Sequence, residues 1–118
     1  MDHRFKSYLR PLRRRWGFTQ HELAYLLGVA SRTIISRVEG GKRTPSLAAA
    51  LALSIVFDAT QPQLFPGVIS SVQESVLRGA NELYEALQGD PSKATRIKLD
   101  FLEEVIARVE EQRPNKTI

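Results

Sequence analysis

Four polar side chains fall together on one face of a short helix that we predict over residues 31–39. In this run, SRTIISRVE, Ser31 is a suitable N-cap, and Ile35 and Val38 would face inward. Arginine can bind guanine through two hydrogen bonds in the major groove, and serine or threonine can contact several bases or the thymine methyl group. The residues on the outer face are therefore candidates for reading bases, although arginines that are merely solvated are the plainer alternative. They are Arg32, Thr33, Ser36 and Arg37.

An enzymatic alternative arises from His21 and Glu22, which form the first half of the zinc-protease pattern HExxH. The second histidine is missing because Tyr25 occupies its position, and the other histidine of the chain is His3. The sequence also lacks cysteine, which excludes a thiolate zinc site, and lacks a glycine-rich phosphate loop. We therefore expect no catalytic residue, no metal and no cofactor.

The helix that precedes the one predicted over residues 31–39 has clear signals at both of its ends. Thr19 is the predicted N-cap, Glu22 stands at the capping-box position, and Gly28 ends the helix. Two short helices would thus meet at a glycine-containing turn. The apolar set of this helix is Leu23, Ala24, Leu26 and Leu27.

A first helix is predicted from apolar residues spaced by three and four, and Gly17 would end it. Pro11 lacks an N–H group, so the helix must begin near Ser7 and keep Pro11 close to its first turn, or else kink. We expect Trp16 and Phe18 in the core rather than as a platform for stacked bases. The periodic set is Phe5, Leu9, Leu12 and Trp16.

A fourth helix, capped by Ser46, has the sequence LAAALALSIVF over residues 47–57. Because it carries no charged residue, we expect it to be buried on most sides as the central helix of the core. Leu64 and Phe65 would anchor a short turn after it.

Two longer helices are predicted in the C-terminal part, where the composition becomes acidic. The first would run from Val68 to Leu87, and the second would open with Asp90 as N-cap and Pro91 as first helical residue. We expect residues 68–113 to form an antiparallel hairpin whose apolar rows cover each other only partly. These rows are Val72, Val76, Ala80, Leu83 and Leu87 in one helix, and Leu99, Leu102, Val105, Ile106 and Val109 in the other.

Charge is distributed unevenly along the 118 residues. Residues 1–45 carry a net charge of +7 and residues 46–118 a net charge of −3. A basic segment suits a polyanion such as nucleic acid, with a solvated basic surface as the alternative on charge alone. With 42% hydrophobic residues, wholesale disorder is not expected. The chain shows no membrane-spanning run and no signal peptide, so we expect a cytoplasmic protein.

Residues 7–65 resemble the helix-turn-helix family of phage repressor and Cro proteins, also called the xenobiotic-response-element type. The resemblance implies an all-α fold, with a four- to five-helix lambda-repressor-like DNA-binding domain over residues 1–66. Residues 67–118 would then be a C-terminal helical hairpin for oligomerisation or partner binding. The matching residues are Arg13, Thr19-Gln20, Glu22-Leu23-Ala24, Leu27-Gly28-Val29, Ser36-Arg37, Glu39, Gly41 and Pro45-Ser46.

The resemblance also implies roles for individual residues. Gln20 looks like the residue that holds a phosphate at the start of the second helix, and Lys42, Arg43 and Thr44 would contact the DNA backbone after the recognition helix. Arg32, Thr33, Ser36 and Arg37 match the base-reading positions. Arg13 and Glu39 each lie beside a core position and would form a buried or half-buried ion pair between the first and third helices.

The turn between the second and third helices departs from the family pattern. Gly28 and Glu39 are eleven positions apart in this chain, where the family usually has ten. We place the extra residue among Gly28, Val29 and Ala30. If the register shifts by one, Ser31 or Ile34 replaces one of the four base-reading candidates.

These features together predict a regulator of transcription that binds specific sequences of double-stranded DNA as a homodimer and is not an enzyme. The alternative function is a protein-interaction module, such as an antitoxin, whose C-terminal helices bind a partner protein. The basic N-terminal half favours the DNA-binding interpretation.

Overall fold

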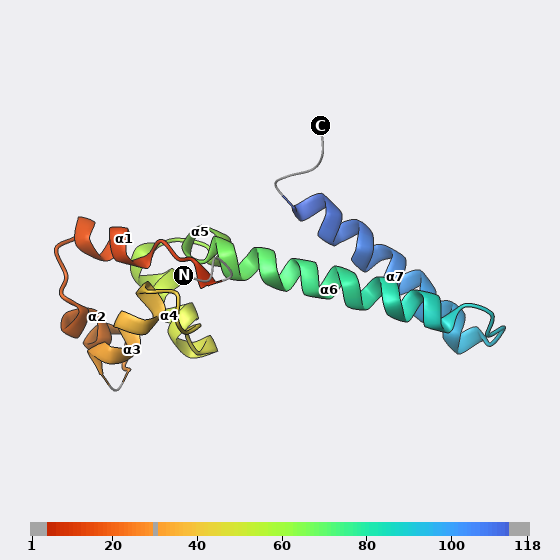
Figure 1. Cartoon of the computed structure of the whole chain (residues 1–118), viewed down its shortest axis with the longest axis horizontal. Helices are drawn as coiled ribbons and strands as arrows, with labels where there is room; N and C mark the ends of the chain where they lie inside the picture. The colour runs from red at the N-terminus through yellow and green to blue at the C-terminus, as the bar shows by residue number, and fades with distance from the viewer. Residues whose placement is uncertain (1–4, 30, 114–118) are drawn as a thin grey trace. The chain divides into compact units, whose positions relative to one another are not determined.

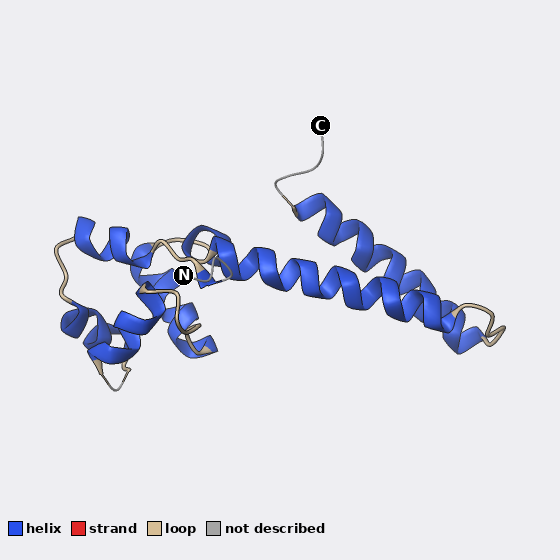
Figure 2. Cartoon of the chain, in the orientation of Figure 1, coloured by secondary structure: helices blue, strands red, loops and turns tan. Residues whose placement is uncertain are grey.

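The computed structural model describes residues 5–29 and 31–113, and all regular elements in these ranges are helices, as Figure 2 shows. The predicted all-α fold is therefore confirmed. His3, the second histidine of the chain, and Ala30, in the predicted turn, lie outside the described residues. The helices in Figure 1 are α1 (Leu9–Arg15), α2 (Gln20–Leu27), α3 (Arg32–Glu39), α4 (Leu47–Phe57), α5 (Gln61–Leu64), α6 (Pro66–Leu87) and α7 (Lys93–Gln112).

The chain forms two compact units, and the boundary between them lies between Ile69 and Ser70. The N-terminal unit contains α1 to α5 and the first residues of α6. The C-terminal unit contains the rest of α6 together with α7.

Local capping signals determine where α2 begins and ends. The backbone N–H of Glu22 donates to Thr19 Oγ1 at 3.0 Å, and the N–H of Thr19 donates to Glu22 Oε1 at 2.9 Å. This is the predicted capping box. Gly28 ends the helix with φ of 68°, in the left-handed region that favours glycine. Pro11 is the third residue of α1, so its missing N–H falls in the first turn, where no intrahelical partner exists.

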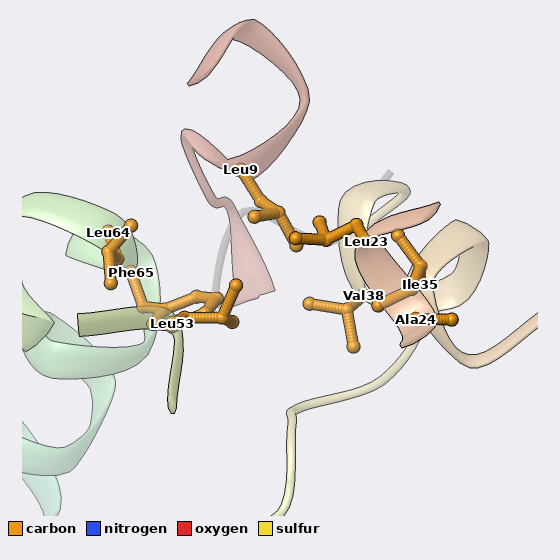
Figure 3. Packing of buried hydrophobic residues seen from close by; sticks show 8 residues of the cluster. All are labelled: Leu9, Leu23, Ala24, Ile35, Val38, Leu53, Leu64 and Phe65. Carbon is orange, nitrogen blue, oxygen red and sulfur yellow. The ribbon is translucent and has the colours of Figure 1, made fainter. Parts of the chain in front are cut away.

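The core of the N-terminal unit is built from one or two side chains of each helix, as Figure 3 shows. Leu9 of α1 reaches toward Leu23 of α2, which packs beside Ile35 and Val38 of α3. Full burial of such side chains contributes about 1.5–3 kcal/mol each. The core thereby holds α2 and α3 together. Its other buried members are Ala24, Leu53, Leu64 and Phe65.

The predicted central position of α4 is wrong. Ala49 and Leu53 are buried, but Leu47, Leu51 and Ile55 are 76%, 53% and 82% exposed. Only one face of α4 therefore meets the core of its unit. The small domain has too few neighbouring elements to surround a helix that is apolar on every side.

The predicted burial of Trp16 is also wrong, because its side chain is 63% exposed and the guanidinium of Arg15 lies 5.8 Å from its ring centre. The helix ends at Arg15, so Trp16 lies just past the last residue for which helical spacing places side chains on one face. Phe18 is half-buried.

In the C-terminal unit, α7 turns back after the end of α6 (Figure 1). Tyr84 Oη donates to the Glu103 carboxylate at 2.7 Å. The N-cap of α7 is Ser92 and not the predicted Asp90. Ser92 Oγ accepts from the N–H of Thr95, while the Asp90 carboxylate accepts from the N–H of Ser92 and from the Thr95 hydroxyl. Asp90 therefore stabilises the turn before the helix.

Candidate nucleic-acid interface

The helix α3 has a buried face and a fully polar outer face. Ile35 and Val38 are 2% and 3% exposed and anchor it to the core. On the outer face all four predicted base-reading side chains are exposed, and none of them has a hydrogen bond or ion pair within residues 5–29 and 31–113. Their donor and acceptor groups are thus available to an external partner. They are Arg32, Thr33, Ser36 and Arg37.

Between α2 and α3 the structure describes Gly28, Val29 and Ser31. Ser31 occupies the N-cap position predicted for it, but its side chain makes no capping hydrogen bond. Of the two residues that a shifted register would bring into the reading set, Ser31 is exposed and Ile34 is half-buried. Arg32 stands at the first helical position, next to the N-terminal end that points its N–H groups outward.

Arg13 and Glu39 form a buried ion pair between α1 and the last residue of α3. Arg13 Nε donates to Glu39 Oε2 at 2.6 Å and Arg13 Nη2 donates to Glu39 Oε1 at 3.1 Å, which is the paired geometry that strengthens arginine–carboxylate contacts. Arg13 Nη1 donates to the Phe18 carbonyl oxygen at 2.8 Å. The side chains are 10% and 0% exposed. This contact fixes the end of α3 relative to α1.

Two further donors surround the Glu39 carboxylate. Arg10 Nε donates to Glu39 Oε1 at 3.3 Å, and Gln20 Nε2 donates to the same oxygen at 3.1 Å. Burial by itself would raise the pKa of Glu39, but the hydrogen bonds from Arg13, Gln20 and Arg10 outweigh it and lower the pKa below its ordinary value. The hydrogen bond to Glu39 correspondingly raises the pKa of Arg13. Glu39 therefore remains ionised and connects α1, α2 and α3.

Sequence reasoning did not find the participation of Arg10 and Gln20 in this network. Arg10 lies one helical turn before Arg13 on α1, which is a signal that it shares the same face. Gln20 is half-buried, and one hydrogen of its side-chain amide is directed to Glu39. The other residues predicted to contact the DNA backbone, Lys42, Arg43 and Thr44, are exposed in the segment after α3.

The segment from Leu23 to Phe57, which contains α3, carries a net positive charge. Between Leu23 and Phe57 the sequence contains a single acid, Glu39, whose charge is neutralised by Arg13 in the interior. The exposed charges of this segment are all cationic: Arg32, Arg37, Lys42 and Arg43. An excess of exposed cationic side chains attracts a polyanion.

No group of three or more histidine, aspartate or glutamate side chains is placed to hold a metal ion in residues 5–29 and 31–113. In the same residues, none of the helices combines the length and hydropathy needed to cross a membrane.

Two short helices at a tight turn, with the second presenting a polar cationic face, define a helix-turn-helix DNA-binding domain. The helix-turn-helix domain family matches residues 5–64 of the chain. An uncharacterized HTH-type transcriptional regulator of Archaeoglobus fulgidus is 40% identical over 60 residues, which cover 51% of this chain and 84% of that protein. No solved structure matched the chain. The chain belongs to the helix-turn-helix family.

Proposed function

We propose that this protein is a transcriptional regulator of the phage repressor and Cro type that reads double-stranded DNA with α3 in the major groove. The observation that carries the proposal is the outer face of α3, where Arg32, Thr33, Ser36 and Arg37 are exposed and unpaired within the described residues. An α-helix fits the major groove, and these side chains match the donors and acceptors on base edges. The relative in Archaeoglobus fulgidus, described as a transcriptional regulator, supports the same function. Under this proposal the protein acts in the cytoplasm, where DNA is accessible, and regulates transcription without catalysing a reaction.

Contacts to phosphate would come from both sides of α3. Lys42, Arg43 and Thr44 follow the helix and are exposed. Gln20 begins α2, where the backbone N–H groups of a helix N-terminus point outward and favour an anion. Phosphate contacts position the protein, whereas the side chains of α3 determine which sequence it prefers.

The experiment compares two variants on a duplex selected from random DNA with the purified protein. Arg32→Ala should relax the preference at one base pair and reduce discrimination by about 1–3 kcal/mol. Lys42→Ala should weaken binding to all duplexes equally and lower the slope of log affinity against log salt by about one. Arg14→Ala, an exposed arginine of α1, is the matched control for loss of one charge. Equal losses on selected and random duplex for Arg32→Ala and Arg37→Ala combined would remove both from the reading set.

We further propose that the α6–α7 hairpin forms a homodimer. The apolar row of α6 is incompletely covered, because Val72, Val76 and Leu83 are 52%, 43% and 49% exposed, and Phe101 of α7, outside the rows, is 58% exposed. A two-fold dimer would present two α3 helices to half-sites about one turn of DNA apart, so a palindromic operator is expected.

Sedimentation at micromolar concentration tests this assembly. The full chain should sediment as a dimer, and Val76→Lys should produce monomer, while Ser75→Lys on the neighbouring polar position should not. A wild-type monomer would refute the dimer. The same exposed rows favour the alternative of an antitoxin-like module, for which a monomer that binds a heterologous protein through the hairpin, without binding DNA, would be the signature.

A further inference from the structure

A pocket with a volume of about 410 Å³ lies between α1 and α5, within the N-terminal unit. Sites for small molecules in proteins typically have volumes of about 300–1,000 Å³. Neither the contacts proposed for DNA nor those of the α6–α7 hairpin involve the residues that line this pocket. They are Tyr8, Pro11, Leu12 and Arg15 from α1 and its N-cap, and Ala59 and Gln63 from the segment before α5 and from α5 itself.

The apolar part of the pocket belongs to a well-packed region of the unit. Leu12 and Ala59 are half-buried and pack against the hydrophobic core. The two walls are joined where the N–H of Tyr8 donates to the Leu64 carbonyl oxygen at 2.8 Å. A ligand with an apolar body would therefore meet a preformed surface, and little free energy would be lost in ordering the protein around it.

Three polar side chains line the same pocket and have hydrogen-bond donors to spare. Gln63 Oε1 accepts from the N–H of Thr60 at 2.8 Å, which leaves both hydrogens of its amide nitrogen unused. The guanidinium of Arg15 lies 5.8 Å from the centre of the Trp16 ring, but it forms no ion pair or hydrogen bond within residues 5–29 and 31–113. The Tyr8 hydroxyl likewise has no hydrogen bond in this part of the chain. All three groups can donate to the same acceptor-rich ligand.

The charge of the lining residues favours an anion. Arg15 is cationic and none of the six lining residues is acidic. A second cation is close, because Lys6 Nζ lies 5.7 Å from the centre of the Tyr8 ring. A guanidinium binds a carboxylate through two parallel hydrogen bonds. A phosphate of DNA would gain nothing from Leu12 and Ala59, whereas a compact apolar molecule that carries a carboxylate matches both parts of the pocket.

We propose that this pocket binds a small organic acid, with its apolar body on Leu12 and Ala59 and its carboxylate paired with Arg15. The site is separate from the face of α3 proposed to bind DNA, and its occupation does not depend on that activity.

An aromatic acid, 2-naphthoate, serves as the probe, and 2-naphthalenemethanol is its uncharged counterpart with the same ring system. Amide proton–nitrogen NMR spectra of the isotope-labelled full chain, assigned and titrated without DNA, report where each compound binds. We expect saturable shifts that are confined to the amides of residues 8–15 and 59–64. The acid should bind roughly three- to tenfold more tightly than the alcohol, because only the acid pairs with a guanidinium.

Two arginine variants test the role of charge. Arg15→Ala should weaken binding of the acid to the level of the alcohol and leave binding of the alcohol unchanged. Arg14→Ala, which removes an exposed charge next to the pocket, should preserve the difference between the two compounds at physiological salt. Dispersed amide signals verify that each variant is folded, and Arg15→Gln replaces Arg15→Ala if the latter does not fold.

Shifts that do not saturate, that spread over the chain or that concentrate on another surface would overturn the proposal. Equal affinities of the acid and the alcohol for the wild-type chain would do so as well, as would equal losses for Arg14→Ala and Arg15→Ala. Because no DNA is present, these results are independent of the proposed operator binding.

Discussion

Replacement of Glu39 by alanine tests directly how α3 is anchored to α1 and α2. The substitution removes the carboxylate that accepts hydrogen bonds from Arg13, Gln20 and Arg10. It leaves the Arg13 guanidinium, whose side chain is only 10% exposed, without its counter-charge. Removal of one partner of a buried ion pair costs about 3–5 kcal/mol, because the remaining charge stays desolvated.

For a domain of this size, 1 kcal/mol changes the melting temperature by about 4–8 °C. Glu39→Ala should therefore lower the Tm by at least roughly 12 °C. Thermal and urea unfolding of the purified full chain, followed by circular dichroism, measure this loss. Arg10→Ala is the matched comparison, because it removes a contact to the same carboxylate from a side chain that is 46% exposed. Its cost should remain below about 1 kcal/mol.

The difference in Tm loss between Glu39→Ala and Arg10→Ala tests whether burial of the ion pair is the source of its stability. A Tm of Glu39→Ala within a degree or two of wild type would show that the pair behaves as a surface contact. Equal losses for Arg10→Ala and Glu39→Ala would show that burial of Arg13 is not the source of the effect.

Three further predictions concern stability. The pKa of Glu39 is lowered in the folded state, so the stabilisation from its ionised form is complete above its unfolded pKa of about 4.3 and disappears as the pH falls through the folded pKa. Between pH 6 and pH 3 the free energy of unfolding, measured with urea, should therefore fall more for wild type than for Glu39→Gln. Thr19→Ala removes the capping box and should cost about 1 kcal/mol, whereas Thr33→Ala, exposed on α3, should change stability little. Gly28→Ala places a side chain in the left-handed region at φ of 68° and should destabilise the folded protein by about 1 kcal/mol. Gly79→Ala lies inside α6, where an added Cβ meets nothing within 4 Å, and should stabilise the folded protein by about 0.5–1 kcal/mol. Urea unfolding measures both changes.

Signals that act over a few residues predicted the ends of α2 and the buried face of α3 well. The side chains of Thr19 and Glu22 each accept a hydrogen bond from the backbone N–H of the other within one turn. Gly28 adopts the left-handed conformation, which glycine reaches at lower cost than other residues. The burial of Ile35 and Val38 follows from helical spacing alone. Such features need no knowledge of the rest of the chain.

The environment of α4 could not be predicted in the same way. Its sequence has no polar row to define which face turns outward, so uniform hydrophobicity indicated burial without identifying what would cover each side. The covering elements are few, and only the face with Ala49 and Leu53 meets them. At the start of α7, Asp90 and Ser92 are both good N-caps two residues apart, and the choice of Ser92 depends on the turn that Asp90 itself stabilises.

Gln20 shows how the ion pair and the proposed DNA contact depend on one another. Its side-chain amide carries two hydrogens, and the hydrogen bond to Glu39 at 3.1 Å uses one of them. The second can donate to a phosphate oxygen while the first holds the amide in a fixed orientation through the same carboxylate that anchors α3. We therefore expect Gln20→Ala to weaken binding to selected and random duplexes by the same factor and also to lower the Tm slightly, by less than Glu39→Ala does.

The matched control for this prediction is His21→Ala, an exposed neighbour on α2 whose removal breaks no described contact with Glu39. Duplex titrations and thermal unfolding of both variants measure the two effects separately. If Gln20→Ala lowers the Tm but binds every duplex as wild type does, Gln20 serves only the interior network and its role at the phosphate is refuted. If both effects appear together, the residue that orients α3 from within also positions it on the DNA backbone, because one amide group serves both contacts.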